Sequence, residues 1–409
     1  MSITPPDVRS QLAPTSANLN FGQDLVAIPG PSIVPDRVLA AMRQPMPDIY
    51  SGDLVDISDE IFAQLPALAR TSGQPFVVIS NGHGAWQMAI SNTLARGDKV
   101  LVLESGRFAI VWGEMAALSG VEVEVLPGAD NRPVDPGALQ ARLAEDHNHE
   151  IKAVLTVHTD TATSVRNDVP AMRAAIDAAD HPALFMVDCI ASLGCEPYTM
   201  DAWGVDITIA ASQKGLMVPP GLAFLWASDK ALAAHERSDI RVGYVDWDMR
   251  LNAEHHYQLY CGTPPVSHLF GLREALAMIA EEGLEARWDR HSAHAAAVWA
   301  AVERWSSEGG IGFNIAEPSN RSTAVTTILT GEIDADELRR RCAGGAGLTL
   351  GLGIGELGNR AFRIGHMGYL NPPMLLGTLA TIEAALHAMG APIGGSGVAA
   401  AAEVVGAYL

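Results

Sequence analysis

The chain has 409 residues, of which 48% are hydrophobic and 18% are charged. This composition excludes a disordered protein, and the length is enough for two domains. With 27 Lys and Arg against 47 Asp and Glu, the net charge is −20, which argues against nucleic acid and anionic membranes as partners. An anionic ligand must therefore be held by local donors.

Neither targeting nor metal-binding patterns stand out. Residues 1–12 lack the apolar core of a signal peptide, and no run of residues is long enough to span a bilayer. The four cysteines show no CxxC or zinc-type spacing, which predicts reduced thiols inside a cell. The run Asp146-His147-Asn148-His149-Glu150 is typical of a solvated loop. We therefore expect a cytoplasmic protein without a metal site.

The first two thirds of the chain predict an arm followed by a large α/β domain. Residues 1–23 are polar and rich in Pro, Ser and Asn, as in an arm, and the large domain is expected over 24–285. Its short apolar strands alternate with helices, which implies a parallel sheet covered on both faces. Strands are expected at 76–79, 100–103, 121–126, 153–157, 183–188 and 205–211, and helices at 35–42, 54–71, 85–94, 108–118, 137–145 and 169–179.

The last third predicts a smaller α+β domain over 286–390, including its linking helix. A short alanine-rich helix without chemistry of its own is expected in the tail, 391–409. Helices are expected at 267–282, 285–306, 334–342 and 372–389, and strands at 324–328, 348–350 and 361–364.

A turn after the strand at 76–79 reads Ser80-Asn81-Gly82-His83-Gly84 and leads into a helix. Unpaired backbone N–H groups and the helix dipole converge at such a turn, which makes it a candidate phosphate site. An ordinary strand-to-helix turn has the same pattern, so this turn gains weight only from the residues described next.

Lys214 differs from the three other lysines of the chain. Lys99, Lys152 and Lys230 lie next to turns or charged residues, whereas Lys214 lies between an apolar strand and the run 216–221. Partial burial lowers the pKa of an amine and frees it as a nucleophile toward a carbonyl. A lysine that merely snorkels from the edge of the core is the alternative interpretation.

Asp188 favours the catalytic interpretation of Lys214. It ends the apolar strand 183–188, and ligands of open α/β sheets bind at the carboxyl ends of strands. Pyridoxal 5′-phosphate requires a lysine for its aldehyde and an acid for its ring nitrogen. Asp188 and Lys214, on consecutive predicted strands, therefore indicate a pyridoxal phosphate site.

The motifs around these two residues resemble those of class V, fold-type I pyridoxal-phosphate aminotransferases, within the alanine–glyoxylate and serine–glyoxylate branch. The resemblance rests on residues 187–194 (Val-Asp-Cys-Ile-Ala-Ser-Leu-Gly), joined through 203–206 to 212–221 (Ser-Gln-Lys-Gly-Leu-Met-Val-Pro-Pro-Gly), and it covers nearly the whole chain. It implies a mostly parallel seven-stranded sheet in the large domain and a homodimer with shared active sites. The implied reaction transfers an amino group from alanine or serine to a 2-oxo acid, with glyoxylate as the expected acceptor.

The resemblance also implies roles for individual residues. Lys214 is expected to hold the cofactor aldehyde and to move a proton, and Asp188 to partner the ring nitrogen. Arg363 is expected to bind the substrate carboxylate through its planar fork, with Gly30 beside the substrate. The other expected cofactor contacts are Asn81, Gly82, His83, Phe108, Thr161, Gln213 and, from the neighbouring subunit, Tyr260 and Thr263.

Three alternatives stay open. A class V lyase such as a cysteine desulfurase needs a mobile catalytic cysteine, for which Cys342, beside two glycines, is the candidate. A transaminase of the same family could take another donor, such as aspartate or pyridoxamine. A non-catalytic α/β protein could bind a nucleotide at residues 81–84, although it lacks GxGxxG and offers no reason for Lys214 and Asp188.

Overall fold

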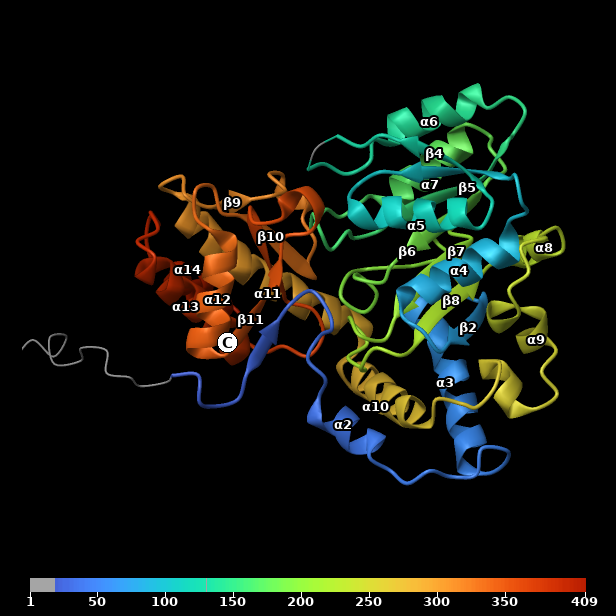
Figure 1. Cartoon of the computed structure of the whole chain (residues 1–409), viewed down its shortest axis with the longest axis horizontal. Coiled ribbons are helices and arrows are strands. Elements are labelled where there is room, and N and C mark those ends of the chain that lie inside the picture. The colour runs from blue at the N-terminus through green and yellow to red at the C-terminus, as the bar shows by residue number, and fades with distance from the viewer. Residues whose placement is uncertain (1–18, 130) are drawn as a thin grey trace, which may run out of the picture.

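Two sheets organise the molecule, and they lie side by side in Figure 1. The computed structural model describes residues 19–129 and 131–409. The larger sheet has seven strands in the order β2-β8-β7-β6-β5-β3-β4, and the smaller has five in the order β1-β11-β12-β10-β9. Within the described residues, no helix is both long enough and apolar enough to cross a bilayer.

The large sheet is mostly parallel, which confirms the predicted fold class. Only β8 runs antiparallel to its neighbours, β2 and β7. Strands β6, β7 and β8 are buried along their whole length, which explains why their sequences are continuous apolar runs without alternation. The strands are β2 (Gln74–Val78), β3 (Lys99–Leu103), β4 (Glu122–Leu126), β5 (Ile151–Val157), β6 (Leu184–Asp188), β7 (Ile207–Ala211) and β8 (Ala223–Ala227).

Helices cover both faces of this sheet, because successive strand residues point to opposite sides. Phe185 and Val187 pack in one core, whereas Leu184 and Met186 pack in the other. The first face is covered by α3 (Asp53–Ala69), α6 (Pro136–Glu145), α7 (Val169–Ala178) and α10 (Val266–Glu282). The second is covered by α4 (Gly82–Thr93), α5 (Arg107–Leu118) and α8 (Asp229–His235).

The small domain forms a third core between its sheet and four helices. Its strands are β1 (Leu25–Ala27), β9 (Gly312–Phe313), β10 (Val325–Leu329), β11 (Leu348–Leu352) and β12 (Ala361–Gly365). Its helices are α11 (Leu284–Ser306), α12 (Ala335–Ala346), α13 (Pro372–Ala388) and the tail helix α14 (Gly397–Gly406). The Glu383 carboxylate accepts hydrogen bonds from the first two N–H groups of α14, which docks the tail helix on this core.

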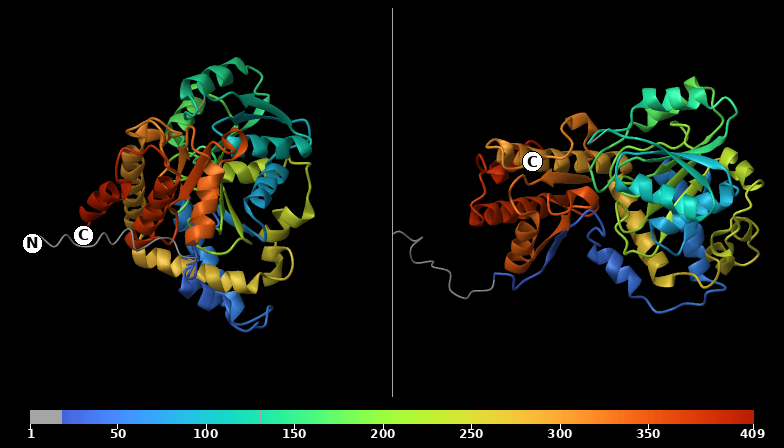
Figure 2. Two further views of the ribbon diagram at one scale, coloured as in Figure 1. Left: turned by 60° about the vertical axis from the view of Figure 1, so that its left-hand side comes forward. Right: turned by 45° about the horizontal axis from the view of Figure 1, so that its top comes forward.

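Strand β1 corrects the expected boundary of the large domain. The sequence analysis began that domain at residue 24, yet Leu25 pairs with Leu348 and Ala27 with Leu350 in the small sheet. Such backbone pairing between distant segments leaves no local sequence pattern. After β1 the chain crosses to α2 (Asp36–Met42) on the large domain, as Figure 2 shows. Of the predicted arm, residues 1–18 lie outside the described part.

The remaining segments are short. They are α9 (Asp248–Leu251) and the 3₁₀ turns η1 (Gly243–Val245), η2 (His256–Tyr260), η3 (Pro318–Asn320) and η4 (Gly355–Leu357).

Candidate active site

One cavity at the carboxyl end of the large sheet collects eight residues predicted from the sequence. The turn before α4, the first turn of α5 and the segments after β5, β6 and β7 meet there, as expected where parallel strands end. The eight are Asn81, Gly82, His83, Phe108, Thr161, Asp188, Gln213 and Lys214.

Asp188 is buried at the end of β6, with both carboxylate oxygens hydrogen-bonded. The indole Nε1 of Trp86 donates to Oδ2 at 2.8 Å, and the backbone N–H of Ile190 donates to Oδ1 at 2.6 Å. Burial nevertheless raises the pKa of Asp188 to about 7, because the two donors only partly replace water. A cation placed beside this carboxylate would hold it ionised.

Lys214 lines the same cavity, and its amine loses its proton more readily than that of an exposed lysine. Desolvation, with a smaller contribution from the Arg363 charge, lowers the pKa of its amine to about 8. The amine donates to the carbonyl of Pro29. A Cβ at Gly30, where φ is +95°, would lie 2.4 Å from Lys214 Nζ. Only glycine therefore leaves room for the amine at this turn.

The N-terminus of α4 forms the opposite wall. Asn81 Oδ1 accepts the N–H of His83 at 3.0 Å, so the helix begins at Gly82, three residues before the predicted start at 85. A Cβ at Gly82 would lie 2.1 Å from Ile190 Cδ1. Backbone N–H groups at such a terminus favour an anion, as predicted for the phosphate turn.

Gln213 has a side-chain amide whose oxygen, Oε1, is buried and is not hydrogen-bonded by any described residue. The side-chain amide can turn to present its NH₂ donors to a ligand. A buried amide of this kind beside an α-helix N-terminus suits a phosphate group.

Arg363 reaches this site from the small domain, where β12 lies between β10 and β11. Its Nε donates to the Leu352 carbonyl at 2.7 Å and its Nη1 to the Thr161 carbonyl at 2.6 Å. Nη2 makes no hydrogen bond within the described residues. The guanidinium is thus fixed on two sides and keeps a donor for a carboxylate.

The sequence analysis missed two side chains of the site, Trp86 and Asp160. Trp86 lies one turn into α4, and its ring packs on His83 with the ring centroids 4.5 Å apart. Asp160 is buried and accepts the N–H groups of Phe108 at 2.9 Å and of Ala162 at 2.8 Å. It thereby fixes both the Phe108 segment and the Thr161 loop, whose side chains line the cavity.

Tyr260 and Thr263, the two residues expected to reach a neighbouring subunit, do not line this cavity. Tyr260 is fully buried in its own chain, and its hydroxyl donates to Ser58 Oγ at 2.9 Å. This burial argues against the expected reach of Tyr260 into a neighbouring subunit. Thr263 is exposed, and its side chain makes no hydrogen bond to any residue that the structure describes.

The cysteine on which a lyase would depend is inaccessible. Cys342 is fully buried in the core of the small domain on α12, and burial raises the pKa of its thiol to about 11. A thiol held in this way cannot act as a mobile nucleophile.

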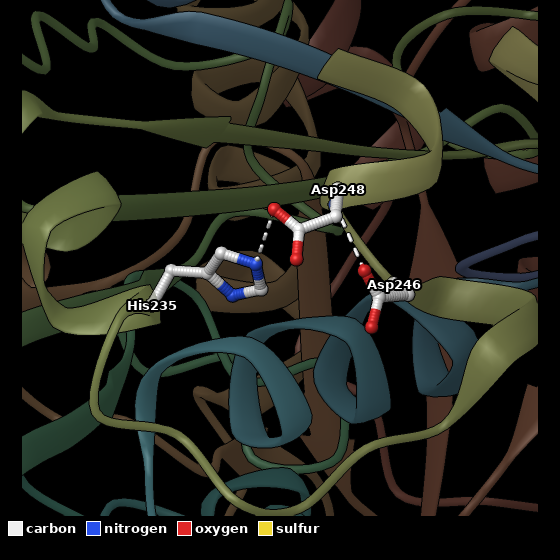
Figure 3. Close-up of side chains that lie close together, drawn as sticks. All are labelled: His235, Asp246 and Asp248. Carbon is white, nitrogen blue, oxygen red and sulfur yellow. Dashed lines mark hydrogen bonds and ion pairs between the residues drawn. The ribbon is translucent and has the colours of Figure 1, made fainter. Parts of the chain in front are cut away.

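A second cluster of polar side chains lies elsewhere, and Figure 3 shows His235, Asp246 and Asp248 close to one another. Arg241 already supplies a positive charge to the cluster. Its Nη1 lies 3.2 Å from His235 Nε2, 3.4 Å from Asp246 Oδ2 and 3.5 Å from Asp248 Oδ2. We therefore interpret these residues as an ion-pair network.

The residues of the cavity fit pyridoxal phosphate. A desolvated amine suits the aldehyde, an acid short of a cationic partner suits the ring nitrogen, and the α4 turn with Gln213 suits the phosphate. Fold and site together define a fold-type I pyridoxal-phosphate enzyme.

Comparisons with known proteins identify the family. The model of the family described as "Aminotransferase class-V" matches residues 64–351. The chain is 41% identical to the serine–glyoxylate aminotransferase of Methylorubrum extorquens, over 93% of this chain and 95% of that protein. It is 37% identical to the L-aspartate–glyoxylate aminotransferase of Paracoccus denitrificans, over 93% and 96%. The chain therefore belongs to the class V aminotransferases, which use pyridoxal phosphate.

Among solved structures, the fold is similar to that of ureidoglycine–glyoxylate aminotransferase from Bacillus subtilis. The TM-score is 0.87 at 27% identity, and the match covers 95% of this chain and 99% of that one.

Proposed function

We propose that this aminotransferase moves the amino group of a small amino acid, serine or alanine, to a 2-oxo acid, glyoxylate in particular. The observation that carries the proposal is a desolvated amine, Lys214, and a buried acid, Asp188, in one cavity, with the Arg363 guanidinium fixed beside it by its bond to the Thr161 carbonyl. The three relatives named above differ in their donors and share glyoxylate in their names. This agreement supports glyoxylate as the acceptor.

Bound pyridoxal phosphate supplies a ring that accepts the electrons left at the substrate Cα. We assign to Lys214 the attachment of the cofactor aldehyde. With the donor bound, the free Lys214 amine would take the proton from the substrate Cα and return it at C4′ of the cofactor. A pKa lowered to about 8 keeps part of this amine neutral near neutral pH, as a base must be.

Asp188 has the role of keeping the ring nitrogen protonated. It can do so only while ionised, and the hydrogen bonds from Trp86 and Ile190 favour that state. A cationic ring nitrogen would in turn lower the pKa of Asp188 from about 7, the value to which burial raises it despite these two hydrogen bonds.

We assign to Arg363 the substrate carboxylate, which accepts from Nη2. The bonds to Leu352 and Thr161 set the plane of the guanidinium, so the carboxylate is oriented as well as bound. Gly30 leaves space beside the Lys214 amine. Phe108 would pack against the cofactor ring, and residues 81–83 with Gln213 would hold its phosphate.

We also propose a cytoplasmic homodimer. Tyr50, Tyr244 and Met249 are large exposed side chains, and the Tyr244 hydroxyl donates at 3.2 Å to the carbonyl of Ile79, just before the phosphate turn. A second copy covering these side chains would bring its Thr263 toward the site. Light scattering that finds a fully active monomer would contradict this part of the proposal.

The donor is tested with the purified holoenzyme, first without an acceptor and then with glyoxylate, which would take the amino group and return the cofactor to its aldehyde form. Serine, alanine, aspartate and pyridoxamine are offered separately, and conversion of the cofactor to its amine form is followed by absorbance. We expect serine or alanine to react fastest and Lys214→Ala to be inactive with every donor. Aspartate or pyridoxamine reacting fastest would change the donor, whereas sulfur released from cysteine as persulfide would replace the transaminase by a lyase.

A further inference from the structure

A second hollow lies at the opposite edge of the large sheet, where β5 and β6 begin. Its volume is about 310 Å³, at the lower end of the range for small-molecule sites, on the order of 300–1,000 Å³. Ile151 at the start of β5, Leu184 at the start of β6 and the last turn of α8 form its apolar wall. None of the residues assigned to the aminotransferase reaction lines it.

The polar residues of this hollow are all basic. Lys152, Lys230, Arg237 and His149 are four of its ten lining residues, and no Asp or Glu is among them. The chain as a whole has 27 Lys and Arg and 13 His in 409 residues, and a net charge of −20. Two of its four lysines meet here. The net negative charge of the protein repels anions, whereas this hollow presents positively charged side chains that attract them.

The donors of these side chains are only partly used. Lys152 Nζ donates to the His149 carbonyl at 2.6 Å, which leaves two N–H groups. Lys230 Nζ donates to the Ala183 carbonyl at 2.9 Å and pairs with Asp206 Oδ2 at 3.3 Å, which leaves one. The Arg237 guanidinium makes no hydrogen bond or ion pair within the described residues, so its five N–H groups are available.

Charge neutralisation within the chain is incomplete as well. Asp206 is the one carboxylate paired with the three cations of the hollow among the described residues. Glu150, the acid next in sequence to His149, is held away by Lys99, whose Nζ lies 3.0 Å from its Oε2. Two formal positive charges therefore remain around the hollow.

From these observations we propose that the hollow is a binding site for a small phosphorylated molecule. A phosphate group matches an array of cationic N–H donors, and arginine can bind it through two parallel hydrogen bonds. The hollow also has an apolar wall from β5, β6 and α8, and the exposed imidazole of His149, against which an organic part of the ligand would pack. Inorganic phosphate, pyrophosphate and a nucleoside monophosphate share this chemistry and differ in size.

The test measures binding to the holoenzyme, in which the catalytic phosphate turn is already filled. Inorganic phosphate, pyrophosphate and AMP are titrated separately by calorimetry at constant ionic strength. We expect saturable binding of at least one probe to the wild type. The double variant Lys152→Gln/Arg237→Gln should weaken it at least tenfold, because it removes seven unused donors and two charges.

The matched control is Arg43→Gln, which removes one positive charge outside the hollow, breaks no side-chain hydrogen bond or ion pair among the described residues, and should bind like the wild type. The single variant Arg237→Gln, which breaks no side-chain hydrogen bond or ion pair among the described residues, provides the same test if the double variant does not fold, with at least a threefold loss expected. AMP binding more tightly than phosphate would support an organic part in the ligand. Absence of saturable binding up to about 10 mM, or equal binding by wild type and variants, would overturn the proposal.

Discussion

Replacing Trp86 by phenylalanine tests whether the Asp188 carboxylate is tuned by its neighbours. The change removes the indole N–H that donates to Asp188 Oδ2 at 2.8 Å inside the protein. A hydrogen bond to a buried charged group contributes about 1.5–3 kcal/mol. Since about 1.4 kcal/mol corresponds to one pH unit, the pKa of Asp188 should rise by about one to two pH units.

The expected consequence is a shift of the acid limb of the pH–rate profile. Asp188 must be ionised to hold the ring nitrogen protonated, so a higher pKa means that activity appears only at higher pH. The logarithm of kcat/KM against pH should therefore show its acid limb displaced upward by about one to two pH units. The absorbance of the bound cofactor should titrate with the same displacement.

Trp112→Phe is the matched control. Trp112 is also buried, its ring stacks on Trp86 at a centroid distance of 5.9 Å, and its Nε1 has no hydrogen-bond partner within the described residues. Both variants lose similar ring volume, but only Trp86→Phe loses a bond to Asp188. Identical pH profiles for the two variants would refute the reasoning, because packing alone would then explain both.

Three further predictions concern the groups around the cofactor amine. Gly30→Ala places a Cβ 2.4 Å from Lys214 Nζ and should lower turnover and cofactor content at least tenfold (about 1.4 kcal/mol). The control is Gly52→Ala, which has φ +77° but no atom near its Cβ and should leave both quantities unchanged. Equal effects of the two variants would point to backbone strain instead. Arg363→Lys loses the planar fork and should lower kcat/KM about 100-fold, mainly by raising KM, as measured by steady-state kinetics. A change below threefold would show that Arg363 does not bind the substrate carboxylate. Because the pKa of Lys214 is lowered to about 8, the rate at which cofactor-free protein reacts with pyridoxal phosphate should rise with pH and level off above about pH 8. A rate that still rises past pH 9 would show that the pKa of this lysine is not lowered.

The catalytic pair could be predicted from the sequence because local patterns determine it. Asp188 and Lys214 each follow an apolar strand, and buried parallel strands end at the same edge of a sheet. The position of Arg363 came from the family resemblance, since an arginine within a strand has no distinctive pattern of its own.

The contacts that tune these groups could not be predicted in the same way. Trp86 meets Asp188 across 102 positions of the chain, and Asp160 meets Phe108 across 52. Both contacts depend on how α4 and α5 pack on the sheet, which hydrophobic periodicity does not specify. The burial of Tyr260 against Ser58 depends likewise on α3, which lies far away in the sequence.

The crossing from β1 to α2 has a mechanical consequence. Pro29 rests on the small sheet, since a Cβ at Gly351 would lie 2.7 Å from Pro29 Cδ and one at Gly365 2.8 Å from Pro29 Cα. The Pro29 carbonyl, which accepts the hydrogen bond of the Lys214 amine, and the Arg363 guanidinium are therefore both attached to the small domain. Any rotation of the small domain moves both groups together. A substrate whose binding shifts Arg363 therefore also changes the distance between the Pro29 carbonyl and the Lys214 amine.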